Sequence, residues 1–161
     1  WELEKKPINW DSKDMELNSG SIDCIWNGFT MNGREDDYTF SEPYVDNSQV
    51  IVVAADSKIE KLDDLAGKNV VVQAASAALD LLQSEEEGGQ KELADTFGAL
   101  NEFADYNTAF TELQAGALDA LAIDVGVAKY QLNSRGEGFK ILDETLNTEQ
   151  YAIGFKKGNR I

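Results

Sequence analysis

Residues Asn69–Glu85, which read NVVVQAASAALDLLQSE, contain the change in hydrophobic period that decides the fold class. The run of valines is typical of a strand that is buried on both faces of a sheet. Ser76 follows at a position suited to a helix N-cap, and the apolar residues after it recur at helical spacing. The stretch therefore predicts a strand that leads into a helix, which is the repeating unit of α/β folds.

The same alternation continues in both directions from this stretch. Before it we expect a helix over Ser12–Asn18, a strand over Ile22–Trp26, a helical turn over Gly33–Asp37, a strand over Ser48–Ala55 and a one-turn helix over Lys61–Leu65. After it we expect strands over Leu100–Ala104, Leu118–Ile123, Phe139–Leu142 and Tyr151–Lys156, and helices over Ala109–Ala115 and Val125–Ser134, the first capped by Asn107 or Thr108. Strands that alternate with helices predict an α/β fold with mostly parallel pairing.

The order of these elements predicts one complete lobe and one incomplete lobe. Residues 51–147 contain a full strand–helix series and form the second lobe, a mostly parallel sheet flanked by helices. Residues 1–50 form part of the first lobe, and residues 148–161 supply a return hinge strand and the remainder of that lobe. A lobe that lacks strands exposes hydrophobic sheet edges. We therefore expect the fragment to be disordered there, to self-associate or to swap elements between copies.

Composition excludes several functional classes. The chain has 161 residues and a formal net charge of −16, which argues against nucleic acid and anionic membranes as partners. It contains no histidine, so histidine-based catalysis and histidine zinc sites are excluded. Its one cysteine, Cys24, lies in an apolar run and is expected to be a buried small side chain. No segment has the length of a membrane span, and none has the pattern of a signal peptide.

A second stretch, Asn27–Tyr44 (NGFTMNGREDDYTFSEPY), predicts part of a site for a small anion. It combines a glycine-containing strand end, the hydroxyl of Thr30 and the guanidinium of Arg34. A guanidinium matches both oxygens of a carboxylate, so a carboxylate is the expected guest.

The chain resembles the solute-binding proteins of polar amino-acid ABC transporters, which have the two-lobed type II periplasmic binding fold. The phrases that carry the resemblance are, in chain order, LNSGSIDCIWNGFT, FSEPY, SQVIVVA, KLDDLAGKNVVVQ, ELQAGALDALAID and TEQYAIGFKKGN. The family begins with a strand and helix before the position of Trp1 and continues through a helix after Ile161. The resemblance therefore implies an internal fragment whose leader is absent.

The resemblance implies that Thr30 and Arg34 hold the α-carboxylate of a bound amino acid from the first lobe. Thr30 would contribute its N–H and hydroxyl. Two alternatives stay open: Thr30 caps the next turn, and Arg34 is an exposed side chain paired with Asp36 or Asp37.

In the second lobe, the resemblance assigns Ser76 to the α-carboxylate and Asp124 to the α-ammonium. This chain has Ala-Ala-Ser-Ala where the family has Gly-Thr-Thr at a helix N-terminus, which is a favourable place for an anion. Asp124 follows a buried strand at the edge where α/β proteins bind ligands. The plainer alternatives are that Ser76 and Asp124 are N-caps of the helices that follow them.

The resemblance also implies roles for Trp10, Asn27 and Gly28. Trp10 would stack on the ligand side chain, with a surface tryptophan covering the first lobe as the alternative. Asn27 and Gly28 end a strand whose polar groups meet the α-ammonium. Alternation places at least one of Trp26 and Phe29 in the core, and we favour Trp26.

These expectations describe a binding protein and not an enzyme, with no metal and no cofactor. Two hinge strands, Ser48–Val53 and about Thr148–Ile153, would let the lobes close around an L-amino acid with a polar or charged side chain. A membrane ABC permease would then accept it. The full-length protein is expected outside the cytoplasm, in the periplasm or lipid-anchored at the cell surface. The alternatives are a cyclohexadienyl dehydratase-like enzyme and a ligand-sensing input domain on the same fold.

Overall fold

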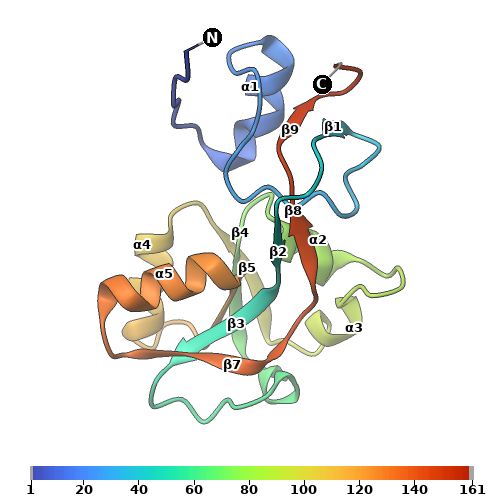
Figure 1. Ribbon diagram of the computed structural model, residues 1–161. Helices are drawn as coiled ribbons and strands as arrows, with labels where there is room; N and C mark the ends of the chain where they lie inside the picture. Colours follow the sequence, from blue (N-terminus) through green and yellow to red (C-terminus); the bar gives the residue numbers. More distant parts are fainter. Residues whose placement is uncertain (1, 160–161) are drawn as a thin grey trace. The chain divides into compact units, whose positions relative to one another are not determined.

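The computed structural model describes residues 2–159, which form two compact units (Figure 1). Unit 1 contains the residues up to Asp46 and those from Glu149 onward, and unit 2 is Asn47–Thr148. The chain therefore passes between the units at Asp46–Asn47 and at Thr148–Glu149. The boundaries expected from the sequence lie close by, at residues 50 and 147.

Unit 2 is built on a five-stranded sheet with the order β5-β4-β6-β3-β7. The strands are β3 (Gln49–Ala54), β4 (Asn69–Gln73), β5 (Ala99–Phe103), β6 (Ala120–Asp124) and β7 (Phe139–Thr145). β4 is parallel to β5 and β6, whereas β3 is antiparallel to β6 and β7. The α/β prediction is confirmed, and the sheet is mixed because β3 runs opposite to the other strands. The crossover from β6 to β7 leaves one position between them, and β3 fills it in the opposite direction.

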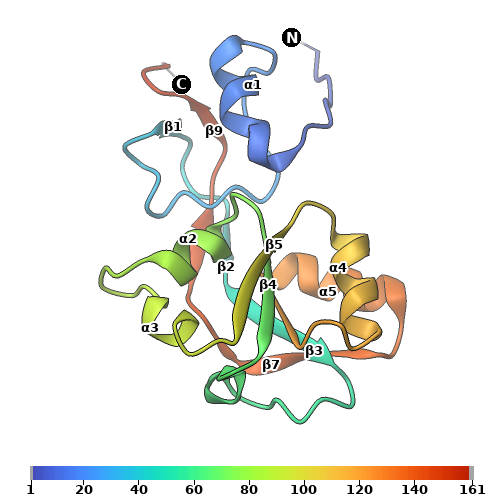
Figure 2. The ribbon, with the colours of Figure 1, turned by 180° about the vertical axis from the view of Figure 1, so that it is seen from behind.

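Helices cover both faces of this sheet (Figures 1 and 2). They are the 3₁₀ helix η2 (Leu62–Leu65), α2 (Ala77–Gln83), α3 (Lys91–Ala94), α4 (Tyr106–Gln114) and α5 (Val125–Arg135). Successive residues of a strand point to opposite faces. Ile51 and Val53 accordingly pack in the cluster that contains α2, and Val50 and Val52 pack in the cluster that contains α4 and α5. The sheet is therefore buried on both sides.

The starts of two helices are set by side-chain caps. The Ser76 hydroxyl accepts a hydrogen bond from the Leu79 N–H at 3.2 Å and begins α2. The Asp105 carboxylate accepts from the N–H groups of Asn107 and Thr108 at 3.1 and 3.2 Å and begins α4. The prediction that Asn107 or Thr108 is this cap was wrong, because a carboxylate precedes them and receives their N–H groups.

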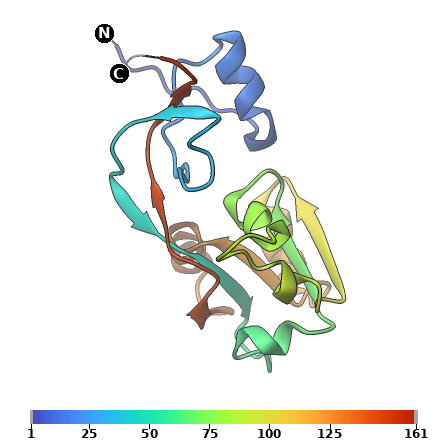
Figure 3. The same ribbon diagram turned by 90° about the vertical axis from the view of Figure 1, so that its right-hand side faces the viewer.

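Unit 1 contains few regular elements among the described residues. They are the 3₁₀ helix η1 (Trp10–Ser12), α1 (Lys13–Ser19), and the strands β1 (Tyr38–Phe40), β2 (Val45–Asn47, which ends in unit 2), β8 (Glu149–Tyr151) and β9 (Gly154–Lys156). β1 pairs with β9 and β2 with β8 (Figure 3). The single strand expected over Tyr151–Lys156 is thus two strands. It is interrupted where the Ile153 N–H donates to the Ser41 hydroxyl at 3.0 Å instead of to a neighbouring strand.

The core of unit 1 is organised around Phe29, which is fully buried. Its ring centroid lies 5.6 Å from that of Trp10, 4.9 Å from Tyr38 and 5.4 Å from Phe40. Trp26, by contrast, is 60% exposed, so the prediction that Trp26 is the core residue was wrong. The strand expected over Ile22–Trp26 is also absent. Only Ile25 pairs there, in an isolated bridge, and a turn at Gly28 (φ +59°) interrupts the expected alternation.

Cys24 is half-buried, which makes it less enclosed than the sequence predicts. Burial, with a smaller contribution from the neighbouring charge of Asp23, raises the pKa of its thiol. The thiol is therefore protonated and weakly nucleophilic at neutral pH. Among residues 2–159, no helix combines the length and the apolar character that a membrane span requires.

Candidate functional site

The backbone N–H and C=O of Thr30 face away from the segment around Tyr151, with which Thr30 pairs. The Met31 N–H donates to the Gln150 carbonyl and the Ala152 N–H donates to the Phe29 carbonyl, each at 3.0 Å. These bonds flank Thr30, so its own N–H and C=O point to the opposite edge. The N–H of Thr30 has no hydrogen-bond partner among the described residues, although the residue is only 3% exposed. A buried donor of this kind is rare and is suited to an anion.

Arg34 lies at the same edge of Thr30. Its Nη1 donates to the Thr30 carbonyl at 3.3 Å, and its guanidinium lies over the Phe29 ring, 5.3 Å from the centroid. The guanidinium and the Thr30 N–H are therefore neighbouring donors within unit 1. A guanidinium and a backbone N–H are donors whose chemistry suits a carboxylate.

The Thr30 hydroxyl has a partner that sequence reasoning missed. It donates to Oε1 of Glu149 at 2.7 Å, and the Glu149 side chain is itself buried. The hydroxyl proton is therefore used inside unit 1, so the donor that Thr30 can offer an anion is its N–H. Glu149 lies in the quoted phrase TEQYAIGFKKGN, but nothing in that pattern indicates a contact with a residue 119 positions away.

The other predicted residues of unit 1 have different surroundings. The rings of Trp10 and Phe29 pack in a T-shaped arrangement, and the Lys13 ammonium lies over the Trp10 ring, 5.4 Å from its centroid. Trp10 therefore covers the core, as the alternative interpretation expects. Asn27 is exposed. Gly28 adopts φ +59°, and a Cβ there would lie 3.5 Å from the Tyr151 ring.

In unit 2, Asp124 is the last residue of β6 and precedes α5, but its side chain does not cap that helix. Its Oδ1 accepts hydrogen bonds from Asn47 Nδ2 at 2.9 Å and from Gln49 Nε2. Both amides are buried. Two neutral amide donors thus hold the carboxylate at the carboxyl end of a strand. Asn47 and Gln49 were not predicted as site residues.

A tyrosine joins the neighbouring strand end to the same region. Gln73 ends β4, which is parallel to β6, so Gln73 and Asp124 lie at the same edge of the sheet. The Tyr106 hydroxyl donates to Gln73 Oε1 at 2.9 Å. Burial, together with the negative charge of Asp124, raises the pKa of Tyr106 above its usual range. Tyr106 therefore remains a protonated donor throughout the physiological pH range.

Ser76 caps α2, as the plainer interpretation expects. The Ser76 oxygen is the acceptor in this bond, so the bond does not use the hydroxyl proton. The residue before it, Ala75, has φ +54° and is the one non-glycine residue with positive φ in the described part of the chain. This conformation is unfavourable for an L-residue. Glycine, which has no Cβ, would adopt it without this cost.

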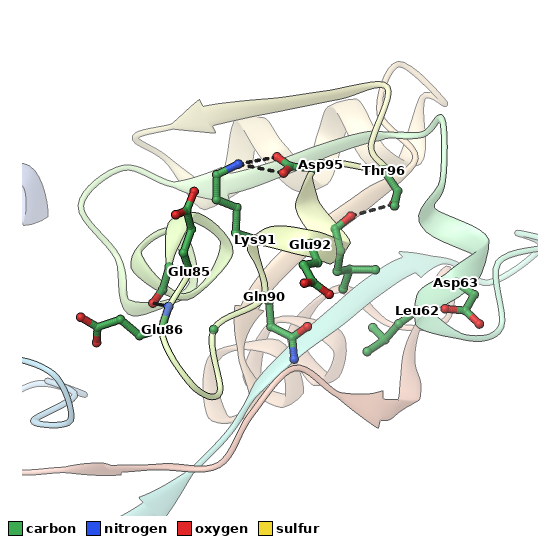
Figure 4. A pocket seen from close by; sticks show the side chains of 12 residues that line it. Leu62, Asp63, Glu85, Glu86, Gln90, Lys91, Glu92, Asp95 and Thr96 are labelled. Carbon is green, nitrogen blue, oxygen red and sulfur yellow. Dashed lines mark hydrogen bonds and ion pairs between the residues drawn. The ribbon is translucent and has the colours of Figure 1, made fainter.

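A separate groove of about 760 Å³ in unit 2 does not contain any predicted site residue (Figure 4). It lies along α3 and the segment between α2 and α3, and five of its twelve lining residues are acidic. Its lysine, Lys91, forms an ion pair with Asp95 at 2.7 Å. Within residues 2–159, no cluster of three or more acidic or cysteine side chains is arranged to hold a metal ion.

Comparison with known proteins gives one family match over nearly the whole chain. The model of the bacterial extracellular solute-binding proteins, family 3, matches residues 1–160. A probable histidine-binding protein of Neisseria gonorrhoeae is 29% identical over 99% of this chain and 58% of its own length. A glutamine-binding protein of Geobacillus stearothermophilus is 32% identical over 96% of this chain and 56% of its own length.

A solved structure is similar over the same extent. It is an ABC uptake transporter substrate-binding protein from Streptococcus pneumoniae with bound histidine, with a TM-score of 0.85 and 32% identity. The match covers 94% of this chain and 62% of that one. The chain therefore spans about three fifths of the length of these relatives.

Proposed function

Because the chain belongs to the bacterial extracellular solute-binding proteins, family 3, we propose that the protein containing it binds a free L-amino acid and delivers it to an ABC transporter permease. The family membership confirms the resemblance inferred from the sequence. Relatives named for histidine and glutamine binding support an amino acid as the ligand. A polar or charged side chain is the proposed class.

The proposed carboxylate contacts are the Thr30 N–H and the Arg34 guanidinium of unit 1. The observation in support is that the N–H is buried, has no partner among the described residues, and lies at the edge that Arg34 occupies. Ser76 would contribute from unit 2, where its hydroxyl proton is not used by the cap bond to Leu79. A carboxylate that replaces water at these donors gains charge-assisted hydrogen bonds.

The proposed ammonium contact is Asp124, and this residue carries the proposal. Its carboxylate lies at the carboxyl end of β6, is held by neutral amides and does not cap α5. Asn27 and Gly28 are proposed to add polar contacts to the same ammonium, and Trp10 to lie against the ligand side chain. Recognition of both charged groups would select a zwitterion over a simple acid or amine.

In the proposed mechanism, the two units belong to two lobes of the whole protein that close around the ligand. The chain passes between the units twice, at Asp46–Asn47 and Thr148–Glu149, and these two passages are proposed as the hinge. Contacts available only in the closed form would shift the population towards closure. The permease would then bind the closed form. No catalytic step is proposed.

The proposed location is outside the cytoplasm, with a lipid anchor in the full-length protein. Membership of an extracellular family supports this location. The chain alone, which lacks part of its relatives' length, is proposed to self-associate or swap elements through unit 1. A ligand-sensing role is one alternative, and a permease gene next to the gene for this protein would favour transport.

Calorimetry of the full-length protein with each of the twenty L-amino acids tests the proposal. We expect micromolar or tighter binding of at least one polar or charged amino acid. Asp124→Asn should weaken that binding by at least tenfold, because it removes the charge that faces the ammonium. Asp143→Asn, which changes an exposed carboxylate of β7, is the matched control and should have no effect.

Two results would contradict the proposed function. One is the absence of binding to all of these amino acids. The other is release of phenylpyruvate from prephenate, which would establish the dehydratase-like alternative. Loss of binding in Asp143→Asn as large as that in Asp124→Asn would instead show that Asp124 has no specific role.

A further inference from the structure

Asp124 belongs to a polar network that the proposed function does not require. Its Oδ1 receives Asn47 Nδ2 and Gln49 Nε2, and the Gln49 side chain is only 1% exposed. The Gln49 backbone is held in turn: its N–H donates to Asn147 Oδ1 at 2.9 Å, and its carbonyl accepts from the Leu146 N–H at 2.8 Å. All of these residues belong to unit 2.

We propose that Asn47 and Gln49 are positioning residues that hold the Asp124 carboxylate in the orientation that binds the ligand ammonium. This inference rests on the proposed function of Asp124. It assigns to the two amides a role in ligand affinity that is separate from their role in folding.

Neutral amides are suited to this task for an electrostatic reason. A carboxylate at the end of a buried strand would otherwise rotate about its side-chain torsions, and fixing it on binding would reduce affinity. Two amide donors restrict that rotation before the ligand arrives. An arginine or lysine at the same place would also hold the carboxylate, but its charge would compete with the ligand ammonium. Amides orient Asp124 without neutralising it.

The strand register explains why these two residues can reach Asp124. Gln49 is the direct antiparallel partner of Asp124 in the pairing of β3 with β6. Asn47, two residues earlier, projects from the same side of the chain. Asn47 is the first residue of unit 2. Asn147, which accepts the hydrogen bond from the Gln49 N–H, lies next to Thr148, the last residue of unit 2. The orientation of Asp124 is therefore coupled to both passages of the chain.

A test that needs no ligand uses the side-chain amide signals of the 161-residue chain in a ¹H–¹⁵N NMR spectrum. Asp124→Asn should shift the NH₂ signals of Asn47 and Gln49, because it removes the charged acceptor of their hydrogen bonds. The NH₂ signals of Gln90 and Gln131, which are hydrogen-bonded elsewhere in unit 2, are the internal controls. If the Asn47 and Gln49 signals stay in place, the proposed network is wrong.

The second test is a double-mutant cycle on amino-acid affinity in the full-length protein. Gln49→Met keeps the length of the side chain and removes the amide, and it should weaken binding about tenfold. In the Asp124→Asn background, the same substitution should change affinity by less than about twofold, since the group that it positions has lost its charge. Gln131→Met removes an amide outside the network and should leave affinity unchanged.

A merely structural role predicts a different pattern. Gln49→Met would then weaken binding by the same factor in both backgrounds, and this result would overturn the inference. Asn47→Ala provides a second cycle in case Gln49→Met fails to fold. If no amino acid binds the wild-type protein, the proposed function fails, whereas the NMR measurement still decides whether the two amides hold Asp124.

Discussion

Ala75 holds a backbone conformation that its side chain disfavours. Its φ of +54° lies in the left-handed region, immediately before the Ser76 cap of α2. An L-residue there loses roughly 1–2 kcal/mol through the approach of Cβ to the following carbonyl. The turn between β4 and α2 therefore stores local strain next to a proposed ligand contact.

Replacing Ala75 with glycine should stabilise unit 2. Glycine removes the Cβ contact but adds flexibility to the unfolded chain, so we expect a net gain of about 0.5–1 kcal/mol in the free energy of unfolding. Urea denaturation measures it. Ala74→Gly is the matched control, because Ala74 does not have positive φ, and it should destabilise the unit. Equal effects of the two substitutions would contradict the assignment of strain to Ala75.

Gly154 is required by the close approach of Phe29. A Cβ added at Gly154 would lie 2.4 Å from Cε1 of the Phe29 ring. Gly154→Ala should therefore displace Phe29 and destabilise unit 1 by about 1–3 kcal/mol, which amide hydrogen exchange of Ile25 and Phe155 would detect. Gly126→Ala in α5 is the control, because an added Cβ meets nothing within 4 Å there. Unchanged exchange in Gly154→Ala would show that the ring repacks freely.

Some residues of the candidate site could be predicted from the sequence, and others could not. Asp124 is recognisable because a carboxylate directly follows an apolar run, and Thr30 and Arg34 lie in one short stretch. Asn47 and Gln49 are not recognisable, since their contact with Asp124 depends on the register of β3 against β6. That register joins residues 75 positions apart, and local pattern contains no information about it.

At the scale of elements, the N-terminus of α4 depends on the ionised form of Asp105. Hydrogen bonds to this carboxylate, first from the Asn107 N–H and then from the Thr108 hydroxyl and N–H, lower its pKa in the folded chain. A group whose pKa is lower in the folded state stabilises the fold above its unfolded pKa. That contribution to stability disappears as the pH falls through the pKa that the group has in the folded state.

Asp105→Asn should isolate this charge, because asparagine can also cap a helix but does not titrate. We expect wild type to be more stable than the variant at neutral pH, by a constant margin above about pH 5. The margin should shrink as the pH falls below the ordinary pKa of an aspartate carboxyl, about 3.9, because the folded-state pKa is lowered. Urea denaturation between pH 2 and 7 measures it. A margin of the same size at pH 2 and pH 6 would show that the charge does not stabilise the cap.

Elements differed in how well they could be predicted. β4 was predicted with its observed bounds, and most other strands and helices of unit 2 within a few residues, because periodicity is strong where a strand is buried on both faces. The strand expected over Ile22–Trp26 failed because unit 1 uses isolated bridges and turns in place of long ladders. The choice of Trp26 over Phe29 failed for the same reason, since alternation has meaning only within a continuous strand.

At the scale of the whole molecule, unit 2 is a single continuous segment of chain. Its sheet is covered by helices on both faces, with two clusters of buried hydrophobic side chains. The strands of this sheet and the helices that cover it lie between Asn47 and Thr148 in the sequence. Unit 2 thus has what an independent domain requires.

Residues 47–148 expressed alone should therefore fold. We expect a cooperative thermal transition and a far-ultraviolet circular dichroism spectrum typical of an α/β protein. Dispersed NMR signals with the β3–β6 register of the whole chain would confirm the structure. A segment that unfolds without cooperativity would show that unit 2 depends on the rest of the chain.

Unit 1 is assembled from two distant stretches, since β1 pairs with β9 across about 110 intervening residues. During translation at about 5–20 residues per second, the first stretch leaves the ribosome roughly 5–20 s before its partner. Unit 2 can be synthesised completely within that interval. Phe29 and Tyr38 stay uncovered until β9, which begins with Gly154, has also been synthesised. The nascent chain consequently exposes aromatic residues for seconds, which makes this half of the protein the expected client of chaperones and the expected target of proteases during synthesis.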